Sequence, residues 1–252
     1  MKKIKKKKTG NSRALPAYVI GYTHADPPPP GYVTAWFDQQ YGGPLSIQFL
    51  SQTGHAQFEA IHTQWRVRIH MSPDSQTAKS WNEQLHWEHT SVIEVFPGSN
   101  SGQSKLDAVL HVARLARGLT LLTDGTAFDV SSSVYLNPSD WQDRVLTTFF
   151  LDEHIQIEQR EKLESGQVWF YTRGLCKFGL DELECLRPTG LSETVVKEVL
   201  EESAEYVVNH GSVPKIGEVI NLQNTGRAVT IVRHRTDQSF GKPVALRELR
   251  WE

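Results

Sequence analysis

The segment Trp169-Phe-Tyr-Thr-Arg-Gly-Leu-Cys-Lys-Phe-Gly-Leu-Asp-Glu-Leu-Glu184 decides the fold class of this chain. It begins as an aromatic, strand-like run, turns at Gly174, and makes a short apolar excursion that ends at Gly179. An acidic stretch with strand character follows. Glycine permits the tight backbone turns that such a connection needs. The segment therefore predicts two neighbouring strands joined by a compact turn, the basic unit of an antiparallel sheet.

The residues around this segment extend the same sheet and add one helix. Strand-like runs at 155–161 and 168–172 enclose a glycine turn and predict a hairpin. A helix is predicted from its cap, Ser192, to His210, and Gly211 is the residue that ends it. Further strands are predicted at 182–186, 228–234 and 244–249.

Upstream of residue 155, helices and strands follow one another without a regular alternation. Apolar and polar residues alternate from Ile61 to Met71, which predicts one long strand with a core face and a basic face. Gly118 is predicted to end a helix, and Asp124-Gly125 to form the type I′ turn of a hairpin. Helices are predicted at 32–40, 72–87, from 101 or 104 to 118, and from 137; strands are predicted at 17–22, 45–51, 58–71, 90–96, 119–123 and 126–130.

Together these elements predict an α+β fold with largely antiparallel sheets and four or five packed helices. The regular strand–helix–strand order of a doubly wound parallel sheet is missing from the pattern. We expect residues 15–252 to form a single α+β domain, with two lobes at about 15–150 and 151–252 as the alternative. Residues 1–14 are predicted to be a disordered basic tail.

The composition of the 252 residues is that of an ordinary globular protein, with 38% hydrophobic and 22% charged side chains. Lys and Arg total 27, Asp and Glu total 29, and six of the lysines lie in residues 1–8. The rest of the chain is therefore acidic, which argues against a basic nucleic-acid-binding body. No run approaches the roughly 20 apolar residues that span a bilayer. No apolar stretch of a secretory signal follows the lysines, so we expect a cytoplasmic protein with free thiols.

The lysine run Met1-Lys-Lys-Ile-Lys-Lys-Lys-Lys8 has three interpretations. A solvated tail is favoured because like charges repel one another and do not pack. An electrostatic arm that contacts RNA or anionic lipid is the second interpretation. A nuclear-import signal is the third.

Motifs of the common enzyme classes are absent from the sequence. There is no G-x-S-x-G elbow, G-x-G-x-x-G loop, H-E-x-x-H or C-x-x-C pair. Gly174 and Gly179 have the spacing of a phosphate loop, but Leu180 occupies the position of its lysine. His86 and His89 offer metal donors, yet no second cluster completes a ligand set. We therefore expect no cofactor and no metal.

One basic stripe resembles a platform for nucleic acid. His62, Arg66, Arg68 and His70 are predicted to share one face of a strand, while Trp65 points to the other face. Sheets that read RNA place aromatic side chains among the basic ones so that bases can stack. A solvated or salt-bridged face is therefore favoured over nucleic-acid recognition.

A candidate binding site lies in the segment at 169–184, together with one carboxylate from the strand at 126–130. Its residues are Thr172, Arg173, Lys177, Glu182 and Asp129. The functional interpretation is a small polar pocket or a partner surface. The structural interpretation, which we favour, is a hairpin connection whose Leu175 and Phe178 fill the core. The pattern assigns no catalytic residue.

The same segment resembles a group of uncharacterised bacterial proteins, a family with a domain of unknown function. The shared pattern is Thr-x-Gly-Leu, then Phe-Gly, then an acidic-Leu-Glu strand. In this chain the matching residues are Thr172, Gly174, Leu175, Phe178, Gly179, Glu182, Leu183 and Glu184. The resemblance covers about residues 90–222, including a helix that ends at Gly211 and the Gly217-Glu218 pair before a strand. It implies a bacterial, cytosolic α+β protein and transfers no catalytic residue.

Three functions are compatible with these patterns. The favoured one is a non-enzymatic protein-binding protein, a regulatory or immunity-type partner, because no motif carries chemistry and 7 Trp, 7 Tyr and 10 Phe can supply contacts. The second is an enzyme of unfamiliar class with a site near Thr172–Glu184 and Asp129. The third is nucleic-acid binding through the lysine tail and the His62–His70 strand face. The sequence identifies neither the protein partner nor the oligomeric state.

Overall fold

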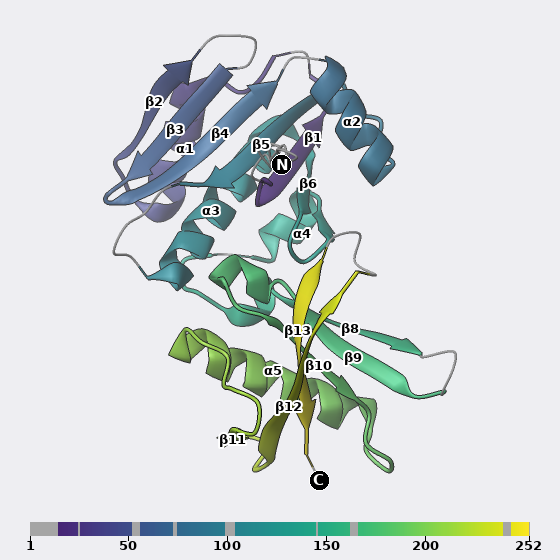
Figure 1. Cartoon of the computed structure of the whole chain (residues 1–252). Helices are drawn as coiled ribbons and strands as arrows, with labels where there is room; N and C mark the ends of the chain where they lie inside the picture. The colour runs from purple at the N-terminus through teal and green to yellow at the C-terminus, as the bar shows by residue number, and fades with distance from the viewer. Residues whose placement is uncertain are drawn as a thin grey trace, which may run out of the picture.

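The computed structural model contains two β-sheets, which lie one above the other in Figure 1. Each sheet has its own hydrophobic core, to which helices contribute apolar side chains. The structure describes residues 15–24, 26–51, 56–72, 75–98, 104–144, 146–161, 166–238 and 243–251. Within these residues the strands, helices and sheets confirm the predicted α+β class with largely antiparallel pairing.

The first sheet is built from the N-terminal half of the chain and is antiparallel throughout. Its seven strands follow the spatial order β2-β3-β4-β5-β1-β6-β7. β1 pairs with β5 on one side and with β6 on the other, so the first strand of the chain lies inside the sheet. The strands are β1 (Tyr18–Tyr22), β2 (Leu45–Ser51), β3 (Ala56–His62), β4 (Trp65–Ser72), β5 (Ser91–Pro97), β6 (Thr126–Asp129) and β7 (Val134–Leu136).

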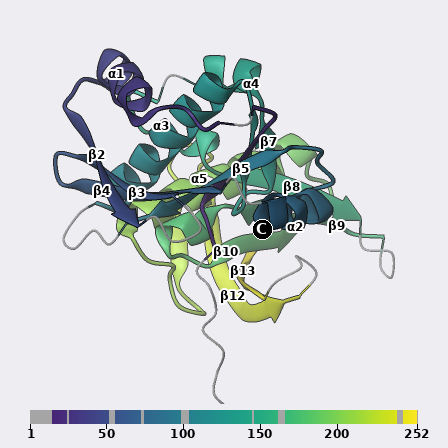
Figure 2. The same cartoon turned by 90° about the horizontal axis from the view of Figure 1, so that it is seen from above.

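Helices cover both faces of the first sheet because its central strands are apolar on both sides. Figure 2 shows α1 (Pro30–Tyr41) and α3 (Lys105–Thr123) on one side and α2 (Ser75–Leu85) on the other. β5 is buried along most of its length, as expected for a strand covered on two faces. The short helix α4 (Pro138–Gln142) places Trp141 in the same core as α3, fully buried.

The second sheet is built from the C-terminal half. Its six strands follow the order β11-β12-β13-β10-β9-β8, and only β10 and β13 run parallel. The helix α5 (Glu193–His210) and the 3-10 turn η2 (Leu175–Phe178) fill one core with apolar side chains. The strands are β8 (Gln156–Glu161), β9 (Val168–Arg173), β10 (Glu182–Leu186), β11 (Val219–Asn221), β12 (Ala228–Asp237) and β13 (Val244–Arg250); a second 3-10 turn, η1 (Leu151–Glu153), precedes β8.

The predicted strand at 58–71 is wrong, because the chain folds back in the middle of it. β3 and β4 form an antiparallel hairpin in which His62 pairs with Trp65. Thr63, in the turn, adopts a positive φ of 55°. Paired residues in a hairpin share a face, so His62 lies on the face of Trp65 rather than with the arginines of β4. The alternating pattern continues through the turn, and periodicity alone does not reveal the reversal.

The predicted end of α3 at Gly118 is also wrong. The helix continues to Thr123, and Asp124 caps it in the left-handed conformation with φ 48°. Gly118 has a packing role instead, since a Cβ atom there would lie 2.6 Å from ring carbons of Trp36 on α1. The predicted strand at 119–123 and its Asp124-Gly125 hairpin therefore do not exist. The strand predicted at 126–130 is present as β6.

Other local predictions are confirmed by the capping contacts. The Ser192 side chain accepts a hydrogen bond from Val195 N at the start of α5, and Gly211 ends the helix with φ 67°. Asn137 and Asp140 form a capping box around α4. No helix among the described residues has the length and apolar character needed to cross a membrane.

Candidate functional site

Glu182, a predicted site residue, holds the turn η2 in place. Its carboxylate is buried and accepts hydrogen bonds from three backbone N–H groups, those of Gly174 (3.0 Å), Leu175 (3.2 Å) and Cys176 (3.1 Å). The Thr172 hydroxyl donates a fourth, at 2.8 Å. Burial raises the pKa of Glu182, and the four hydrogen bonds oppose that rise. Both residues therefore stabilise the connection between β9 and β10.

Lys177 and Asp129, two further predicted site residues, form an ion pair between the two sheets. Lys177 lies in η2 and Asp129 at the end of β6, and their side chains are only 5% and 3% exposed. The second Asp129 oxygen accepts hydrogen bonds from the backbone N–H groups of Ser131 (3.0 Å) and Ser132 (3.1 Å). The ammonium group of Lys177 also donates to the carbonyl of His154 at 2.5 Å. The ion pair is thus a buried link between the sheets, and both of its charged groups are already bound to partners within the chain.

Arg173, the fifth predicted residue, also connects the sheets. One of its guanidinium nitrogens lies 3.1 Å from Glu158 on β8. Another donates to the hydroxyl of Ser133, in the turn between β6 and β7. All five predicted residues therefore lie along one junction, and each is held by partners within the chain. Their role as a ligand-binding site stays a prediction, and Leu175 and Phe178 are buried as the structural interpretation expected.

The predicted basic stripe is split between two faces and engaged by neighbours. Arg66 pairs with Glu59 across the hairpin at 2.6 Å, and the Arg68 guanidinium lies 5.8 Å from the centre of the Phe96 ring. His62 instead stacks on buried His111 in the core of the first sheet, with ring centres 5.7 Å apart. Arg66, Arg68 and His70 still share one face of β4, and nucleic-acid binding by this strand stays a prediction. The lysine run lies outside the described residues.

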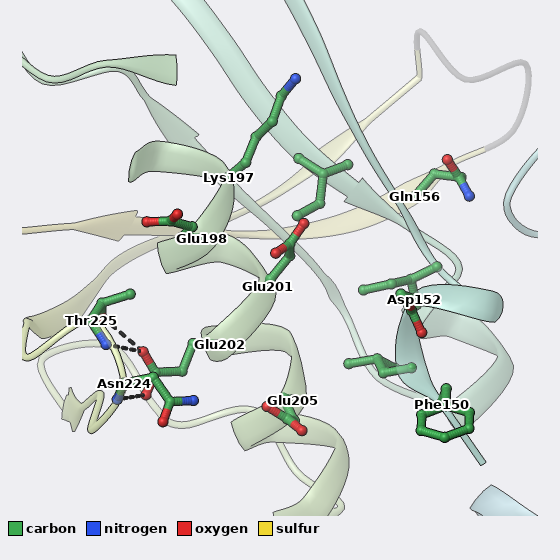
Figure 3. A pocket seen from close by; sticks show the side chains of 13 residues that line it. Phe150, Asp152, Gln156, Lys197, Glu198, Glu201, Glu202, Glu205, Asn224 and Thr225 are labelled. Carbon is green, nitrogen blue, oxygen red and sulfur yellow. Dashed lines mark hydrogen bonds between the residues drawn. The ribbon is translucent and has the colours of Figure 1, made fainter. Parts of the chain in front are cut away.

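A groove opens between α5 and the segment from η1 to β8 (Figure 3). We call it the α5–β8 groove. Its volume is about 750 Å³. Its lining residues are Phe150, Leu151, Asp152, Ile155, Gln156, Ile157, Lys197, Glu198, Glu201, Glu202, Glu205, Asn224 and Thr225. A second hollow of about 390 Å³ shares Glu202, Glu205 and Asn224, so the depression continues along α5.

Acidic side chains line the α5 wall of this groove. Glu198, Glu201, Glu202 and Glu205 follow the helical spacing of one face, and Asp152 joins them from η1 (Figure 3). Partial burial raises the pKa of Glu201, and repulsion by Glu198 and Asp152 raises it further. The Lys197 side chain, which also lines the groove, lowers the pKa of Glu201 in part.

Glu202 differs from the other carboxylates because it has a structural partner. It accepts hydrogen bonds from the backbone N–H groups of Asn224 (2.7 Å) and Thr225 (2.8 Å) and from the Thr225 hydroxyl (2.8 Å) (Figure 3). These bonds lower the pKa of Glu202. Glu202 thereby fixes the turn after β11 against α5 and defines one end of the groove.

Apolar groups form the opposite wall and the floor. Leu151 and Ile157 are half-buried against the core of the second sheet, and Ile155 is buried. The Phe150 side chain is 58% exposed, an unusual position for a phenylalanine. The groove therefore combines an acidic wall, an aliphatic floor and an exposed aromatic ring.

The groove was not predicted from the sequence, although one feature of the α5 sequence indicated it. The helix prediction at 192–210 considered the apolar face of Val196, Val199 and Val207. The opposite stripe of four glutamates has the same periodicity, but a charged stripe on an amphipathic helix usually faces only solvent. The apolar wall that turns the stripe into a groove comes from residues 150–157, and nothing in the spacing places them beside α5.

Comparison with known proteins gives one match. The model of a family described as "Protein of unknown function (DUF4026) C-terminal" matches residues 155–239. This stretch holds β8 to β12 and α5, and it includes most of the residues that line the groove. No curated protein and no solved structure matches the chain. The C-terminal part of the chain is therefore similar to a domain of unknown function, whereas the motif at 172–184 and the extension of the resemblance back to residue 90 stay predictions.

Metal binding has no supporting arrangement in the described part of the chain, where no three His, Cys, Asp or Glu side chains are grouped to hold an ion. This includes the acidic wall of the α5–β8 groove, whose carboxylates are spread along the helix. His86 follows the last residue of α2 and is exposed, and His89 is half-buried.

Proposed function

We propose that the chain is a non-enzymatic binding protein that holds a basic segment of a partner protein in the α5–β8 groove. Lysine or arginine side chains of the partner would pair with the glutamates of α5. Apolar side chains of the same segment would rest on Leu151, Ile157 and Phe150. A segment of this kind is amphipathic, with basic and apolar residues on different sides.

One observation carries the proposal: Glu198, Glu201 and Glu205 are exposed in the groove and form no hydrogen bond or ion pair within the described residues. Clustered like charges destabilise the free protein. A cationic ligand would relieve that repulsion, and the aliphatic wall beside the charges would add apolar contact area. The same carboxylates on a convex helix surface would lack that second contribution.

The lining chemistry supports binding rather than catalysis. The groove residues include no serine, cysteine or histidine, and the Thr225 hydroxyl is bound to Glu202. General acid–base catalysis requires two groups whose environments separate their pKa values, with a substrate between them. Here partial burial raises the pKa of Glu201, and the neighbouring carboxylates of Glu198 and Asp152 raise it further. Such a wall attracts and orients cations.

The cellular setting belongs to the same proposal. We propose that the protein acts in the bacterial cytoplasm, as a regulatory or immunity-type partner of another protein. The resemblance of the segment at 172–184 supports the bacterial origin. The two cysteines, Cys176 and Cys185, are free thiols, which is typical of a reducing compartment.

The binding of a short fluorescent peptide of alternating lysine and leucine, followed by fluorescence anisotropy, tests the proposal. The triple variant Glu198→Gln, Glu201→Gln, Glu205→Gln is expected to bind about tenfold more weakly. Three partly exposed ion pairs of about 0.5 kcal/mol each account for that factor. A matching peptide with glutamate in place of lysine should not bind.

A control variant separates the groove from net charge. The variant Glu83→Gln, Glu88→Gln, Asp143→Asn removes three exposed carboxylates that do not line the groove, and it should bind the peptide like the wild type. If wild-type protein does not bind the basic peptide, or if both triple variants lose affinity equally, the groove is not the binding site.

A further inference from the structure

The apolar wall of the α5–β8 groove is not built by the strands of the second sheet alone. Phe150 and Leu151 come from residues 146–155, which lie between the helix α4 of the first half of the chain and the strand β8 of the second. We call residues 146–155 the connecting segment. The position of the wall relative to the glutamates of α5 depends on the contacts that hold this segment.

Arg114, on α3, holds the first part of the connecting segment. Its Nε donates to the carbonyl oxygen of Leu146 at 2.7 Å, and a second guanidinium nitrogen donates to that of Thr147 at 2.9 Å. The half-buried guanidinium group also lies 4.8 Å from the centre of the Tyr41 ring on α1. Because a guanidinium group presents its N–H donors in a rigid plane, one side chain can hold two consecutive carbonyl groups.

The backbone of Leu146 explains why the segment needs such a contact. Leu146 adopts a φ of 54°, a left-handed conformation that is unfavourable for leucine. Its side chain is buried in the core of the first sheet. A residue in this conformation persists only where its surroundings fix it. Loss of the paired hydrogen bonds from Arg114 would therefore let the turn relax and shift the residues that follow it.

The next residues transmit the position of this turn to the groove. Phe149 packs against both cores and stacks on His154, with ring centres 4.9 Å apart. Phe150 is extended, with φ −123° and ψ 127°, so its side chain points away from that of Phe149 and lines the groove (Figure 3). The placement of Phe149 thus determines where Phe150 and Leu151 lie relative to α5.

We propose that Arg114 is a positioning residue that makes the α5–β8 groove selective for basic segments that also carry apolar side chains. This inference rests on the proposed function. The glutamates of α5 attract any cationic segment, whereas Phe150 and Leu151 add contact area only for apolar side chains. Arg114 does not line the groove and acts through the connecting segment. A residue of the first half of the chain thereby controls the selectivity of a site in the second half.

Two peptides measure this selectivity by fluorescence anisotropy with the full chain. One alternates lysine with leucine, and the other alternates lysine with glutamine. The wild type is expected to bind the leucine peptide about tenfold more tightly, because apolar contacts add to the attraction between charges.

Arg114→Lys keeps the positive charge but loses the planar pair of donors. We expect its preference for the leucine peptide to fall to about threefold, with the affinity for the glutamine peptide unchanged. A general loss of stability would weaken the binding of both peptides alike, so the ratio of the two dissociation constants identifies a positioning role.

Arg117→Lys is the matched control. Arg117 lies on the same helix and donates to the Trp141 carbonyl at 3.0 Å and to the Tyr41 hydroxyl at 2.8 Å, so its hydrogen bonds fix α4 and α1 instead of the connecting segment. This variant should keep the wild-type preference. Hydrogen exchange of the free proteins should be faster at the amides of residues 153–155 in Arg114→Lys and unchanged there in Arg117→Lys.

The outcomes separate this inference from the proposed function. A wild type that binds neither peptide overturns the proposed function and this inference with it. A wild type that binds both peptides equally overturns this inference alone. The same holds if Arg114→Lys retains the full preference, or if Arg117→Lys loses the preference to the same extent.

Discussion

Lys177 and Asp129 form an ion pair that joins the two sheets, and both side chains are almost completely buried. Lys177 comes from the turn between β9 and β10, and Asp129 from the end of β6. The Lys177 ammonium group also lies 5.9 Å from the centre of the Tyr18 ring on β1. Arg173 and Ser133 connect the same elements beside it. The halves of the chain are therefore coupled by specific polar contacts.

Removal of either charge of this pair should destabilise the protein strongly. Lys177→Met and Asp129→Asn each leave one buried charge without its partner, which costs roughly 3–5 kcal/mol. The double variant should lose less than the sum of the two single variants, because no unpaired charge remains. Urea unfolding measures all three. Additive losses in the double variant would show that the pair is not an energetic link between the sheets.

Glu182→Gln should destabilise the protein by about 2 kcal/mol. The amide nitrogen of glutamine is a donor, so it cannot accept hydrogen bonds from the backbone N–H groups that point at the carboxylate. Glu193→Gln is the matched control, because Glu193 pairs with Arg187 on the surface and should change stability by less than about 1 kcal/mol. Equal effects of the two substitutions on the urea midpoint would contradict the role given to Glu182.

Two buried histidines should make the protein sensitive to mild acid. The pKa values of His111 and His154 are lowered to about 3, mainly because both side chains are buried. Neither ring nitrogen of either residue has a hydrogen-bond partner within the described residues. Below an unfolded pKa near 6.5 the unfolded chain binds protons that the native protein does not, so stability falls as the pH falls from 6.5 towards 3.

The pH dependence of the urea midpoint checks this expectation. The double variant His111→Phe, His154→Phe has no such groups to protonate, and its stability should change much less between pH 6.5 and pH 4. Wild-type stability that stays flat over this interval would show that the two side chains are protonated in the native state.

Gly118→Ala separates helix propensity from packing. Alanine is favoured over glycine in a helix interior by about 1 kcal/mol. The added Cβ, however, would lie 2.6 Å from the Trp36 ring, and overpacking of this kind costs roughly 1–3 kcal/mol. We expect a net loss of stability that Trp36→Leu partly reverses in the same chain. A more stable Gly118→Ala protein would mean that α1 moves away without cost.

Much of the fold could be predicted from the sequence because caps, turns and periodicity are local. Ser192 and Gly211 define α5 through contacts within a few residues. The errors arose where the pattern permits two structures. An alternating run through Thr63 reads as one strand although it is a hairpin, and Gly118 reads as a stop although it accommodates Trp36 from another helix.

The candidate site could be predicted only in part. The segment at 172–184 stands out in the sequence because its glycines and buried carboxylate shape an unusual turn. The turn is unusual because the Glu182 carboxylate accepts hydrogen bonds from three backbone N–H groups. The α5–β8 groove depends on Phe150 and Leu151 lying beside Glu201, some 50 positions further along the chain. Sequence spacing carries no information about that long-range contact.

Photo-crosslinking from the groove tests the central claim most directly. Two variants of the chain are made. In one, a photoreactive phenylalanine analogue replaces Phe150; in the other, it replaces Tyr135, which is also an exposed aromatic residue. Both are irradiated in lysate of the source organism, and the crosslinked peptides are sequenced by mass spectrometry. We predict that position 150, but not position 135, captures lysine- or arginine-rich segments, and that Glu198→Gln, Glu201→Gln, Glu205→Gln abolishes the capture. Segments without an excess of basic residues, or equal capture from both positions, would contradict the account.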